Sequence, residues 1–359
     1  MGGSEKLLLH MLRELAAQND SEFQHHICVI DGSGTLLSEF QATGFPTVYF
    51  MAKHGLDVKE IGKFIRYLRS QPFDIIHFHS IISTIVFAWL FNSAHIIRSD
   101  HGGRLLNTKG WKLKRDRWVM RFIDLLINKH IAVSNLVNMQ LQHTYNIASS
   151  KIEVIHNGIL VRPVLNNRQY LRKQLNLNED DFVVGVVARL LHGKGVQYVI
   201  HAIKLLIEQG VACKLVIVGE GPYRGELEHI TEQLSLNEYV QFTGLLTDTS
   251  EIYTLFDTFV FSSIWQESFG MTLLEALSAG IPLIAFNRGA VSEIITDGFN
   301  GFLIEPSSEE LAEKILFIQR DLLLRRSLKA NALQSIQDRF RLETKLNRLL
   351  EVYREVSRR

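Results

Sequence analysis

Two glutamates near the start of a predicted helix are the residues of this chain best suited to chemistry. Glu267 and Glu275 are separated by seven residues, and Gly270 between them lies where the strand-like run Thr258 to Ser263 turns into a helix. Unpaired N–H groups at a helix start attract phosphate, and an ionised carboxylate accepts hydrogen bonds from sugar hydroxyls. The spacing therefore predicts a nucleotide-sugar site, although an ordinary well-capped helix would carry the same residues.

Two cations and several glycines in the same half of the chain favour this interpretation. Arg189 ends the strand-like run Phe182 to Arg189, and Lys194 follows it. An arginine grips phosphate oxygens in a fork and a lysine adds a mobile point charge, so the pair could neutralise a departing diphosphate. An isolated pair would more often be two solvated loop cations, but Gly219-Glu220-Gly221 and a turn at Gly244 belong to the same half.

Strand-like runs alternate with helical patterns along the chain, which is typical of α/β proteins with parallel sheets covered by helices on both faces. Two series of similar size predict two doubly wound, Rossmann-like domains facing each other across a cleft. The first series comprises residues 26–30, 46–51, 75–79, 95–100, 130–134 and 152–155, and the second 182–189, 214–218, 240–243, 258–262, 282–286 and 301–304. We expect an N-terminal domain over 1–160, a connection over 161–181, a C-terminal domain over 182–337 and an amphipathic helix over 338–359.

The first domain lacks one expected element. A doubly wound domain normally opens with a central strand, but this chain opens on the turn Gly2-Gly3 and a helical pattern carrying Leu8, Met11 and Leu15. Loss of that strand would expose apolar edges and destabilise the domain. We therefore expect Met1 to be an internal methionine of a longer natural protein, or the gene to be truncated. The alternative is that another segment fills the gap.

Taken together, these segments resemble the family 4 (group 1) retaining glycosyltransferases, which have the GT-B fold. The resemblance covers nearly the whole chain and is most specific in its second half. The matching segments are Gly2-Gly3-Ser4-Glu5, His101-Gly102, Val133-Ser134, Ile155-His156-Asn157-Gly158, Arg189 with Lys194, Gly219-Glu220-Gly221, Glu267 to Glu275, Gly289, Glu293 and Asn300-Gly301.

The resemblance implies a role for each donor-side residue. Glu267 would lie close to the transferred sugar, Glu275 would bind ribose hydroxyls, and Arg189 and Lys194 would contact the phosphates. The Gly2-Gly3 loop would approach the diphosphate from the opposite domain, on which the C-terminal helix is expected to pack back. Backbone groups would meet the sugar and diphosphate at Phe269, Gly270, Met271 and Thr272.

In the first half of the chain, most candidate site residues are histidines. His101 matches a histidine that in the family faces the reacting sugar, so we expect it to orient donor or acceptor, although a satisfied histidine at a strand end is the alternative. His77 and His79 alternate to one face of another strand, and Ser134 ends a third. These three are further acceptor-side candidates.

The resemblance also implies transfer with retention, often described as a front-face displacement in which the leaving phosphate assists deprotonation of the acceptor. Catalysis would then rest on positioning and on electrostatic stabilisation by Glu267, His101, Arg189 and Lys194. The sequence contains no Asp-x-Asp, with which many sugar transferases hold a divalent ion. We expect a nucleotide-sugar co-substrate, no metal and no other cofactor.

A basic segment that also contains tryptophans suggests where the protein binds its acceptor. Lys114, Arg117 and Arg121 fall on one helical flank, and Trp111, Trp118 and Phe122 on another, which is typical of a helix at an anionic membrane surface. The cations of the segment, against the single acid Asp116, are Arg104, Lys109, Lys112, Lys114, Arg115, Arg117 and Arg121. We expect peripheral docking near a glycan or lipid-linked acceptor. A solvated basic face above an ordinary core stripe is the alternative.

Composition and the lengths of apolar runs argue against several other classes of protein. With 39 Lys and Arg against 38 Asp and Glu, the net charge of +1 gives no global field for nucleic acid. The longest apolar run, Ile81 to Phe91, is shorter than the roughly 20 residues of a membrane span, and no apolar signal region opens the sequence. Cys28 and Cys213 match no metal spacing and are expected to be buried thiols. We expect a cytoplasmic protein, with any membrane contact at the inner face of the plasma membrane.

Two other functions stay open. A nucleotide-sugar epimerase or phosphorylase could share the fold, since fold does not fix the reaction. A nucleotide-sugar-binding protein without turnover is the rival from another class, because the first strand appears to be missing. A nicotinamide dehydrogenase is disfavoured, because no Gly-x-Gly-x-x-Gly joins a strand to a helix.

Overall fold

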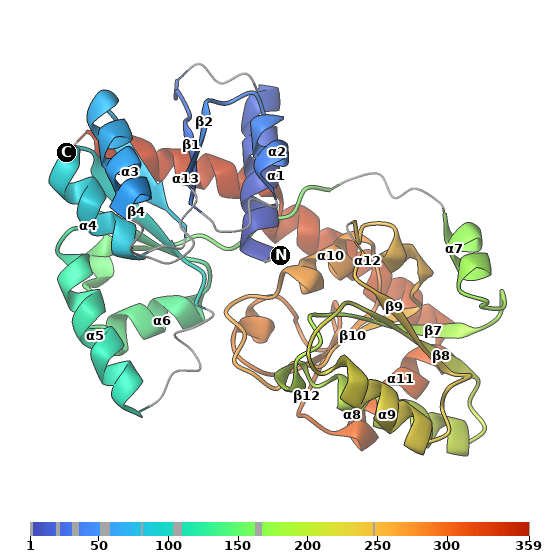
Figure 1. Cartoon of the computed structure of the whole chain (residues 1–359). Helices are drawn as coiled ribbons and strands as arrows, with labels where there is room; N and C mark the ends of the chain where they lie inside the picture. The colour runs from blue at the N-terminus through green and yellow to red at the C-terminus, as the bar shows by residue number, and fades with distance from the viewer. Residues whose placement is uncertain are drawn as a thin grey trace. The chain divides into compact units, whose positions relative to one another are not determined.

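The computed structural model describes residues 3–18, 22–30, 36–50, 58–79, 82–102, 110–161, 167–246 and 248–358. The chain forms two compact units (Figure 1). Unit 1 comprises Met1–Leu160 together with Leu342–Arg359, and unit 2 comprises Val161–Arg341. The C-terminal helix α13 (Leu342–Ser357) therefore belongs with the first half of the chain.

Unit 1 alternates short parallel strands with helices. Its strands are β1 (Ile27–Ile30), β2 (Thr47–Phe50), β3 (Ile75–Phe78), β4 (His95–Asp100), β5 (Lys129–Ala132) and β6 (Ile152–Val154), and its helices before α13 are α1 (Gly3–Gln18), α2 (Leu37–Gln41), α3 (Val58–Ser70), α4 (Ile82–Phe91), α5 (Gly110–Asp124) and α6 (Asn135–His143). The strands form two separate parallel sheets, β1-β2 and β3-β4-β5-β6. Within the described residues, no strand precedes α1 and none joins β1 to β3.

Two apolar clusters hold the two sheets of unit 1. Leu9 and Leu12 of α1 pack with Ile27 of β1 on one face. On the other face, Phe64 of α3 packs with Phe50 of β2, in a cluster that also holds residues of β3, α4 and β4. Helix α13 is tied to this unit by polar contacts, since Arg348 donates through Nε to Glu153 Oε1 at 3.0 Å. Tyr353 Oη lies 2.7 Å from His77 Nδ1.

Unit 2 contains one continuous parallel sheet. Its strands are β7 (Phe182–Val187), β8 (Cys213–Val218), β9 (Val240–Gly244), β10 (Thr258–Phe261), β11 (Leu283–Phe286) and β12 (Phe302–Ile304), and its helices are α7 (Arg168–Gln174), α8 (Val196–Glu208), α9 (Arg224–Gln233), α10 (Met271–Ser278), α11 (Ser308–Arg320) and α12 (Leu322–Arg339). The strand order is β12-β11-β10-β7-β8-β9. The first strand of unit 2, β7, therefore lies in the middle of the sheet.

Apolar side chains explain why this sheet is buried on both faces. Val183 and Val184 are neighbours on β7, point to opposite faces and are both fully buried. Strands of this kind read as continuous apolar runs rather than alternating ones. Helix α8 covers one face with a stripe of buried residues at helical spacing: Val196, Val199, Ile200, Ile203 and Leu206.

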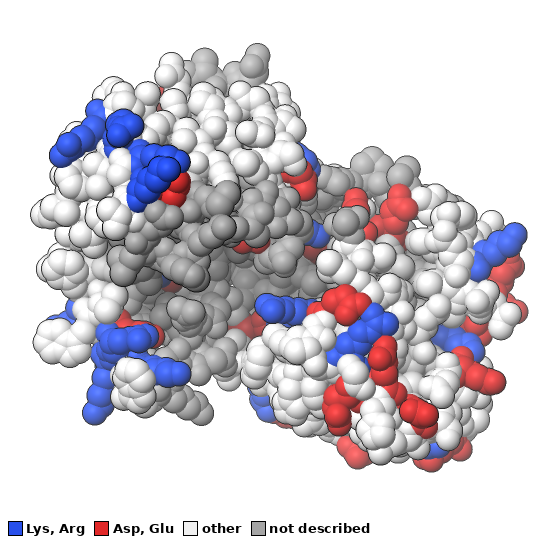
Figure 2. All heavy atoms as spheres, viewed as in Figure 1, with Lys and Arg blue, Asp and Glu red and all other residues white. Residues whose placement is uncertain are grey.

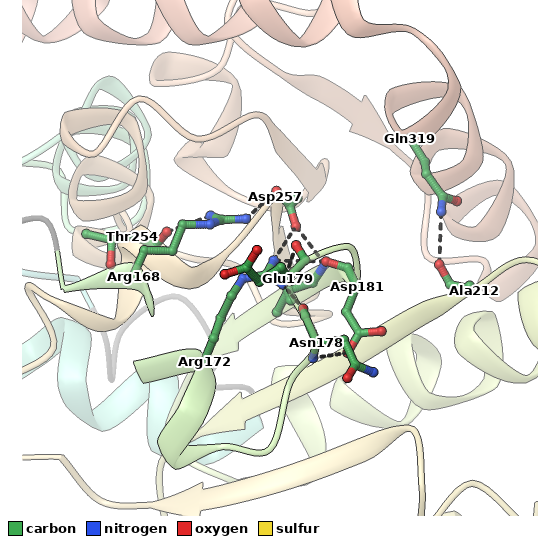
Figure 3. A network of polar contacts seen from close by, with 10 residues as sticks. Arg168, Arg172, Asn178, Glu179, Asp181, Ala212, Thr254, Asp257 and Gln319 are labelled. Atoms are coloured by element: carbon green, nitrogen blue, oxygen red, sulfur yellow. Dashed lines mark hydrogen bonds and ion pairs between the residues drawn. The ribbon is translucent and has the colours of Figure 1, made fainter. Parts of the chain in front are cut away.

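A polar network fixes residues 167–181 on unit 2 (Figure 3). Arg168 of α7 donates to Asp257 Oδ1 at 2.8 Å. Arg172 lies 3.4 Å from the other oxygen of Asp257 and donates to the Asp181 carbonyl at 2.9 Å. The backbone N–H of Val183 also donates to Asp257, at 2.9 Å. The segment expected as a connection is thus anchored to the start of β7 and belongs to unit 2.

The fold class expected from the sequence is confirmed. Each of the twelve strand-like runs overlaps one strand of the structure, and the largest shift at either end is two residues, at the end of β5 and of β7. Such differences are usual at strand ends, where pairing frays. Cys213 is buried as expected, but Cys28 is exposed, because β1 has a described neighbour on one edge only.

Candidate functional site

Glu267 is held in the turn that follows β10. Its Oε1 lies 2.6 Å from Lys194 Nζ and also accepts a hydrogen bond from the Ser263 hydroxyl. Both side chains of the ion pair are partly accessible, with exposed fractions of 24% for Lys194 and 17% for Glu267. The carboxylate thus has a fixed direction and still reaches solvent.

The backbone of Glu267 is clamped by a glycine. Gly289 forms a parallel bridge with Glu267, and Ala290 N donates to Glu267 O at 2.8 Å. Gly289 has φ +72°, and a Cβ there would lie 2.3 Å from Glu267 O and 2.4 Å from Glu267 N. Only glycine fits both this φ and this approach. Gly289, which lies in the loop after β11, therefore fixes the backbone position from which the Glu267 carboxylate extends.

The two cations expected to meet phosphate differ in their surroundings. Lys194 is half-buried and paired with Glu267, whereas Arg189 is exposed. No described residue forms a side-chain hydrogen bond or ion pair with Arg189, so its guanidinium is available to a ligand. Both residues follow β7, and Glu267 follows β10, the neighbouring strand. Carboxyl ends of parallel strands are where open α/β sheets bind ligands.

The predicted anion cradle is the start of α10. Gly270 is its N-cap residue, has φ +113° and offers no capping side chain. Met271 and Thr272 occupy the first turn and are half-buried, while the Phe269 side chain is buried in the core. A helix start without a side-chain cap leaves backbone N–H groups for an external acceptor. The contribution expected from Phe269 is thus limited to its backbone.

Glu275 is oriented by a buried tyrosine. Tyr253, only 1% exposed, donates its hydroxyl to Glu275 Oε2 at 2.7 Å, and Thr249 Oγ1 lies 3.4 Å from the same oxygen. Burial, and then the charge of Glu275, raise the pKa of Tyr253 well above its ordinary value, so the hydroxyl stays a donor. Glu275 is half-buried, one turn inside α10.

Glycines allow loops to cross closely at the same edge of the sheet. Gly219 has φ +135°, and a Cβ there would lie 1.9 Å from Ala188 O; one at Gly221 would lie 2.1 Å from Leu190 O. The loops after β7 and β8 are therefore in backbone contact, which the Leu190 N to Glu220 O hydrogen bond of 2.9 Å completes. Gly219 and Gly221, noted in the sequence as glycine turns, therefore allow the two loops to pack closely.

The three candidate histidines of unit 1 gather in one place. The ring centroids of His77 and His79 are 4.2 Å apart, and those of His79 and His101 are 5.9 Å apart and stacked. His77 Nε2 lies 2.8 Å from Ser99 Oγ. His101 Nε2 is buried without a hydrogen-bond partner among the described residues. The rings line a small pocket, whose walls also include Leu7 and Met11 of α1 and Leu349 of α13.

Burial keeps these histidines neutral. Burial, and then the charge of Lys345, lower the pKa of His77 to about 3 and that of His101 to about 4. Burial lowers the pKa of His79 well below its ordinary value. Neutral imidazoles can donate from one nitrogen and accept at the other, so this cluster can bind hydroxyl groups.

Lys345 is a residue of this pocket that sequence reasoning missed. It lies on α13, is 8% exposed and donates to Asn157 Oδ1 at 3.2 Å. Burial lowers its pKa to about 8. A lysine at an apolar position of an amphipathic helix was the available signal. Ser263 and Tyr253, which orient the two glutamates, were also missed, because neither stands in a recognisable spacing with its partner.

The other candidates of unit 1 are Ser134 and the N-terminal glycines. Ser134 is fully buried, and its Oγ accepts from Val137 N at 3.1 Å as the N-cap of α6. That hydrogen bond gives Ser134 a structural task at the helix start. Gly2 lies outside the described residues, and Gly3 is the first residue of α1.

From Gly110 onward the basic segment forms helix α5, and Lys and Arg side chains gather over this helix on the face shown in Figure 2. Trp111, Trp118 and Phe122 are 67%, 77% and 58% exposed, whereas Met120 and Ile123 make the core contacts of this helix. The three aromatic residues are therefore not a core stripe, and that alternative is wrong for them. Arg104 and Lys109 lie outside the described residues.

The described part of the chain contains neither a candidate metal site nor a membrane-spanning helix. No cluster of three or more His, Cys, Asp or Glu there is arranged to hold a metal ion. No helix among the residues described is both long enough and apolar enough to span a membrane.

Two protein families match the chain, one on each half. The family described as Glycosyltransferase Family 4 matches residues 1–161, and that described as Glycosyl transferases group 1 matches residues 167–335. The chain therefore belongs to the group 1, family 4-type glycosyltransferases of the GT-B fold.

Individual relatives are distant but extend over most of the chain. An N-acetyl-alpha-D-glucosaminyl L-malate synthase of Bacillus anthracis is 24% identical, covering 84% of this chain and 80% of the relative. A UDP-Gal:alpha-D-GlcNAc-diphosphoundecaprenol alpha-1,3-galactosyltransferase of Escherichia coli is 25% identical, covering 83% and 79%. The crystal structure of HepE from Anabaena with UDP-glucose superimposes with a TM-score of 0.83, at 21% identity, over 99% of this chain and 96% of that one. The family and the two curated relatives support glycosyl transfer from a nucleotide-sugar donor, and the likeness to HepE shows the shared fold.

Proposed function

We propose that this chain transfers a hexose from a nucleotide-sugar donor to a glycan or lipid-linked acceptor, with retention of anomeric configuration, in the synthesis of a cell-surface polysaccharide or glycolipid. The observation that carries the proposal is the constellation at the carboxyl ends of β7 and β10. There Lys194 pairs with Glu267 at 2.6 Å, and α10, which has no side-chain cap, begins at Met271, four residues after Glu267. The Escherichia coli galactosyltransferase, which uses UDP-Gal, and the HepE structure with UDP-glucose support the choice of donor.

Each donor-side group then has one task. Glu275, held by Tyr253, accepts hydrogen bonds from ribose hydroxyls. The N–H groups at the start of α10 and the free guanidinium of Arg189 bind the diphosphate. When the donor binds, Lys194 contacts its phosphates and its ion pair with Glu267 weakens or breaks. The Glu267 carboxylate can then accept hydrogen bonds from the transferred sugar.

The reaction follows from these positions. As the bond from the sugar to the diphosphate breaks, negative charge grows on the leaving phosphate oxygen, and Arg189, Lys194 and the helix start stabilise it. The leaving phosphate takes the acceptor proton on the same face, so no protein nucleophile is needed. His101, neutral at physiological pH, orients donor or acceptor hydroxyls, with His77 and His79 beside it.

Metal independence is part of the proposal, because Arg189, Lys194 and the start of α10 would supply the positive charge that a divalent ion can supply to a leaving diphosphate. Excess EDTA should leave the initial rate of transfer unchanged. Loss of activity that a divalent ion restores would contradict metal independence.

The stereochemistry of transfer is tested by nuclear magnetic resonance of the product's anomeric proton, which should show the same anomeric configuration as the donor sugar.

Donor binding provides the direct test. A thermal-shift screen against a panel of nucleotide sugars should give one that raises Tm, since a ligand of the folded state stabilises it. Glu275→Gln should then weaken that donor about tenfold, the loss of a charge-assisted pair of hydrogen bonds. The exposed Glu232→Gln on α9 serves as the matched control. Equal donor affinity in both variants would refute the assignment of Glu275.

The same measurements separate the rival functions. Donor binding with neither transfer nor slow hydrolysis of the donor would favour a binding protein without turnover. Conversion of the donor into its epimer without an acceptor would favour an epimerase.

We further propose that α5 docks unit 1 on an anionic membrane surface at the inner face of the plasma membrane. The exposed Trp111, Trp118 and Phe122 beside Lys114 and Arg121 support this, because aromatic rings enter the headgroup layer while cations meet anionic lipids. An acceptor carried on a lipid would then be presented where the enzyme binds.

Flotation with vesicles of phosphatidylglycerol and phosphatidylcholine tests the docking. Charge reversal at Lys114, Arg117 and Arg121 should abolish binding, while the same reversal at the exposed Lys173, Arg326 and Lys329 of unit 2 should not. Since Arg117 Nε donates to Thr144 O at 2.7 Å, Trp118→Ser provides a second variant that keeps this contact. Undiminished flotation of both α5 variants would overturn the proposal.

A further inference from the structure

The end of α11 and the start of α12 form an exposed apolar groove on the surface of unit 2. Phe317 of α11 is 48% exposed, and Leu322 and Leu323, the first two residues of α12, are 51% and 77% exposed. The half-buried Leu316 lines the same groove. Single apolar side chains at a surface need no explanation, but contiguous ones bordered by charged residues are typical of a contact site.

This groove lies at the edge of the sheet opposite the donor-side residues. Gln319 of α11 donates through Nε2 to Ala212 O at 2.9 Å (Figure 3), and Ala212 directly precedes β8. The end of α11 is therefore close to the amino ends of the strands. Lys194 and Glu267 follow the carboxyl ends of β7 and β10, which are parallel to β8. A partner bound in the groove therefore does not cover the donor-side residues.

One acid and one base border the groove on either side of Phe317. Glu313 precedes Phe317 by four residues and Arg320 follows it by three, so the three side chains lie along one face of α11. Glu313 and Arg320 are both exposed, and neither forms an ion pair or a side-chain hydrogen bond with another described residue. The second acid of the groove, Asp321, already accepts from Leu324 N at 2.9 Å as the N-cap of α12.

We propose that this groove binds the same groove of a second copy of the chain, with the two α11 helices antiparallel about a twofold axis. The midpoint between Glu313 and Arg320 falls between Leu316 and Phe317. An axis there places Glu313 of each copy against Arg320 of the other, as a self-complementary interface requires. It also brings Phe317 of each copy to Leu316 of the other. A partner of one charge sign would match one end of the groove, whereas a second copy matches both.

Sedimentation velocity of the full chain tests the dimer and its register. The unchanged chain should form dimers at concentrations up to about 100 μM. Glu313→Arg and Arg320→Glu each place like charges at both ends of the interface, so each should raise the dimer Kd at least about tenfold. The double variant restores opposite charges across the axis and should return the Kd to within about threefold of the original. Glu232→Arg on the exposed face of α9 is the control and should leave the Kd unchanged.

A further variant tests the apolar part of the groove. Leu323→Ser removes its most exposed apolar side chain, so it should raise the dimer Kd at least about tenfold and change Tm by no more than about 1 °C. A chain that stays monomeric at about 100 μM, or a double charge variant no tighter than either single one, would overturn the proposal. A monomeric chain whose vesicle flotation is lost in Leu323→Ser would assign the groove to a lipid surface and would equally overturn it. None of these measurements involves a donor, so the dimer can fail while the proposed transfer stands.

Discussion

The two units are both built from parallel strands and helices but differ in where the charge of their candidate residues lies. In unit 2 the sheet is continuous, and the candidate groups at its carboxyl edge are ionised and reach solvent: Arg189, Lys194, Glu267 and Glu275. In unit 1 the described sheet is divided, and His77, His79 and His101 are half-buried and neutral. The candidate residues of unit 2 are therefore charged side chains, whereas the candidate histidines of unit 1 offer hydrogen bonds without a charge of their own. This difference suits an enzyme that must stabilise a leaving diphosphate in one unit and orient hydroxyl groups in the other.

Removing the charge of Glu267 gives the largest expected effect on this contrast. Glu267→Gln keeps acceptors for Lys194 and Ser263 but loses the negative charge, so we expect kcat to fall about 100-fold or more with little change in donor affinity. Steady-state kinetics with Glu232→Gln as control measures it. A variant with full kcat would show that charge in unit 2 is not what drives transfer.

A backbone change separates position from charge. Gly289→Ala forces a Cβ against the backbone of Glu267 at a positive φ, whereas Gly298→Ala has a similar φ of +70° and open space. We expect Gly289→Ala to destabilise unit 2 by about 2 kcal/mol more than Gly298→Ala and to lower kcat as well. Urea unfolding of the two variants gives the difference. Equal losses would mean that only φ strain matters and that the clamp on Glu267 is weak.

Acid should affect the neutral histidines of unit 1. Their pKa values in the folded chain lie below the ordinary 6.5, so the unfolded state binds more protons as the pH falls. Stability from this source is fully present above pH 6.5 and is lost toward pH 4, by about 1.4 kcal/mol per pH unit for each histidine still neutral.

Amide exchange between pH 7 and pH 4, corrected for intrinsic rates, measures this loss. Peptides of β3 and β4 should lose protection, and His79→Asn should reduce the slope by about one proton. The exposed His143→Gln should leave the slope unchanged. A slope that is the same in the His79 and His143 variants would mean that the histidine cluster does not control the acid response.

The smallest expected effect comes from the residue that orients Glu275. Tyr253→Phe removes one hydrogen bond to Glu275 Oε2 and leaves the carboxylate charged. Donor affinity should fall about threefold, less than for Glu275→Gln, with kcat nearly unchanged. Calorimetric titration of both variants with the donor checks the order. A larger loss in Tyr253→Phe than in Glu275→Gln would mean that Tyr253 contacts the donor itself.

Much of the fold could be predicted from the sequence, because apolar runs bounded by glycine and polar residues are local signals. His95 to Asp100 is found as a strand with the bounds expected, and the turn at Gly270 does lead from strand to helix. The pairing of Lys194 with Glu267 could not be predicted, since 73 residues separate them in the chain. The exposure of Trp118 was equally open, because helical spacing gives a shared flank but not which flank meets the core.

The sequence by itself determined the order of strands and helices, the family to which the chain belongs, and the residue types available for chemistry, because these depend on neighbours along the chain. Only the tertiary structure decided which groups are ionised, paired or buried. Tyr253 reaches Glu275, Gly289 fixes Glu267, and Lys345 enters a pocket of histidines through contacts between residues distant in sequence. Burial and charge depend on everything packed around a group, and packing is settled only when the sheets and helices have assembled.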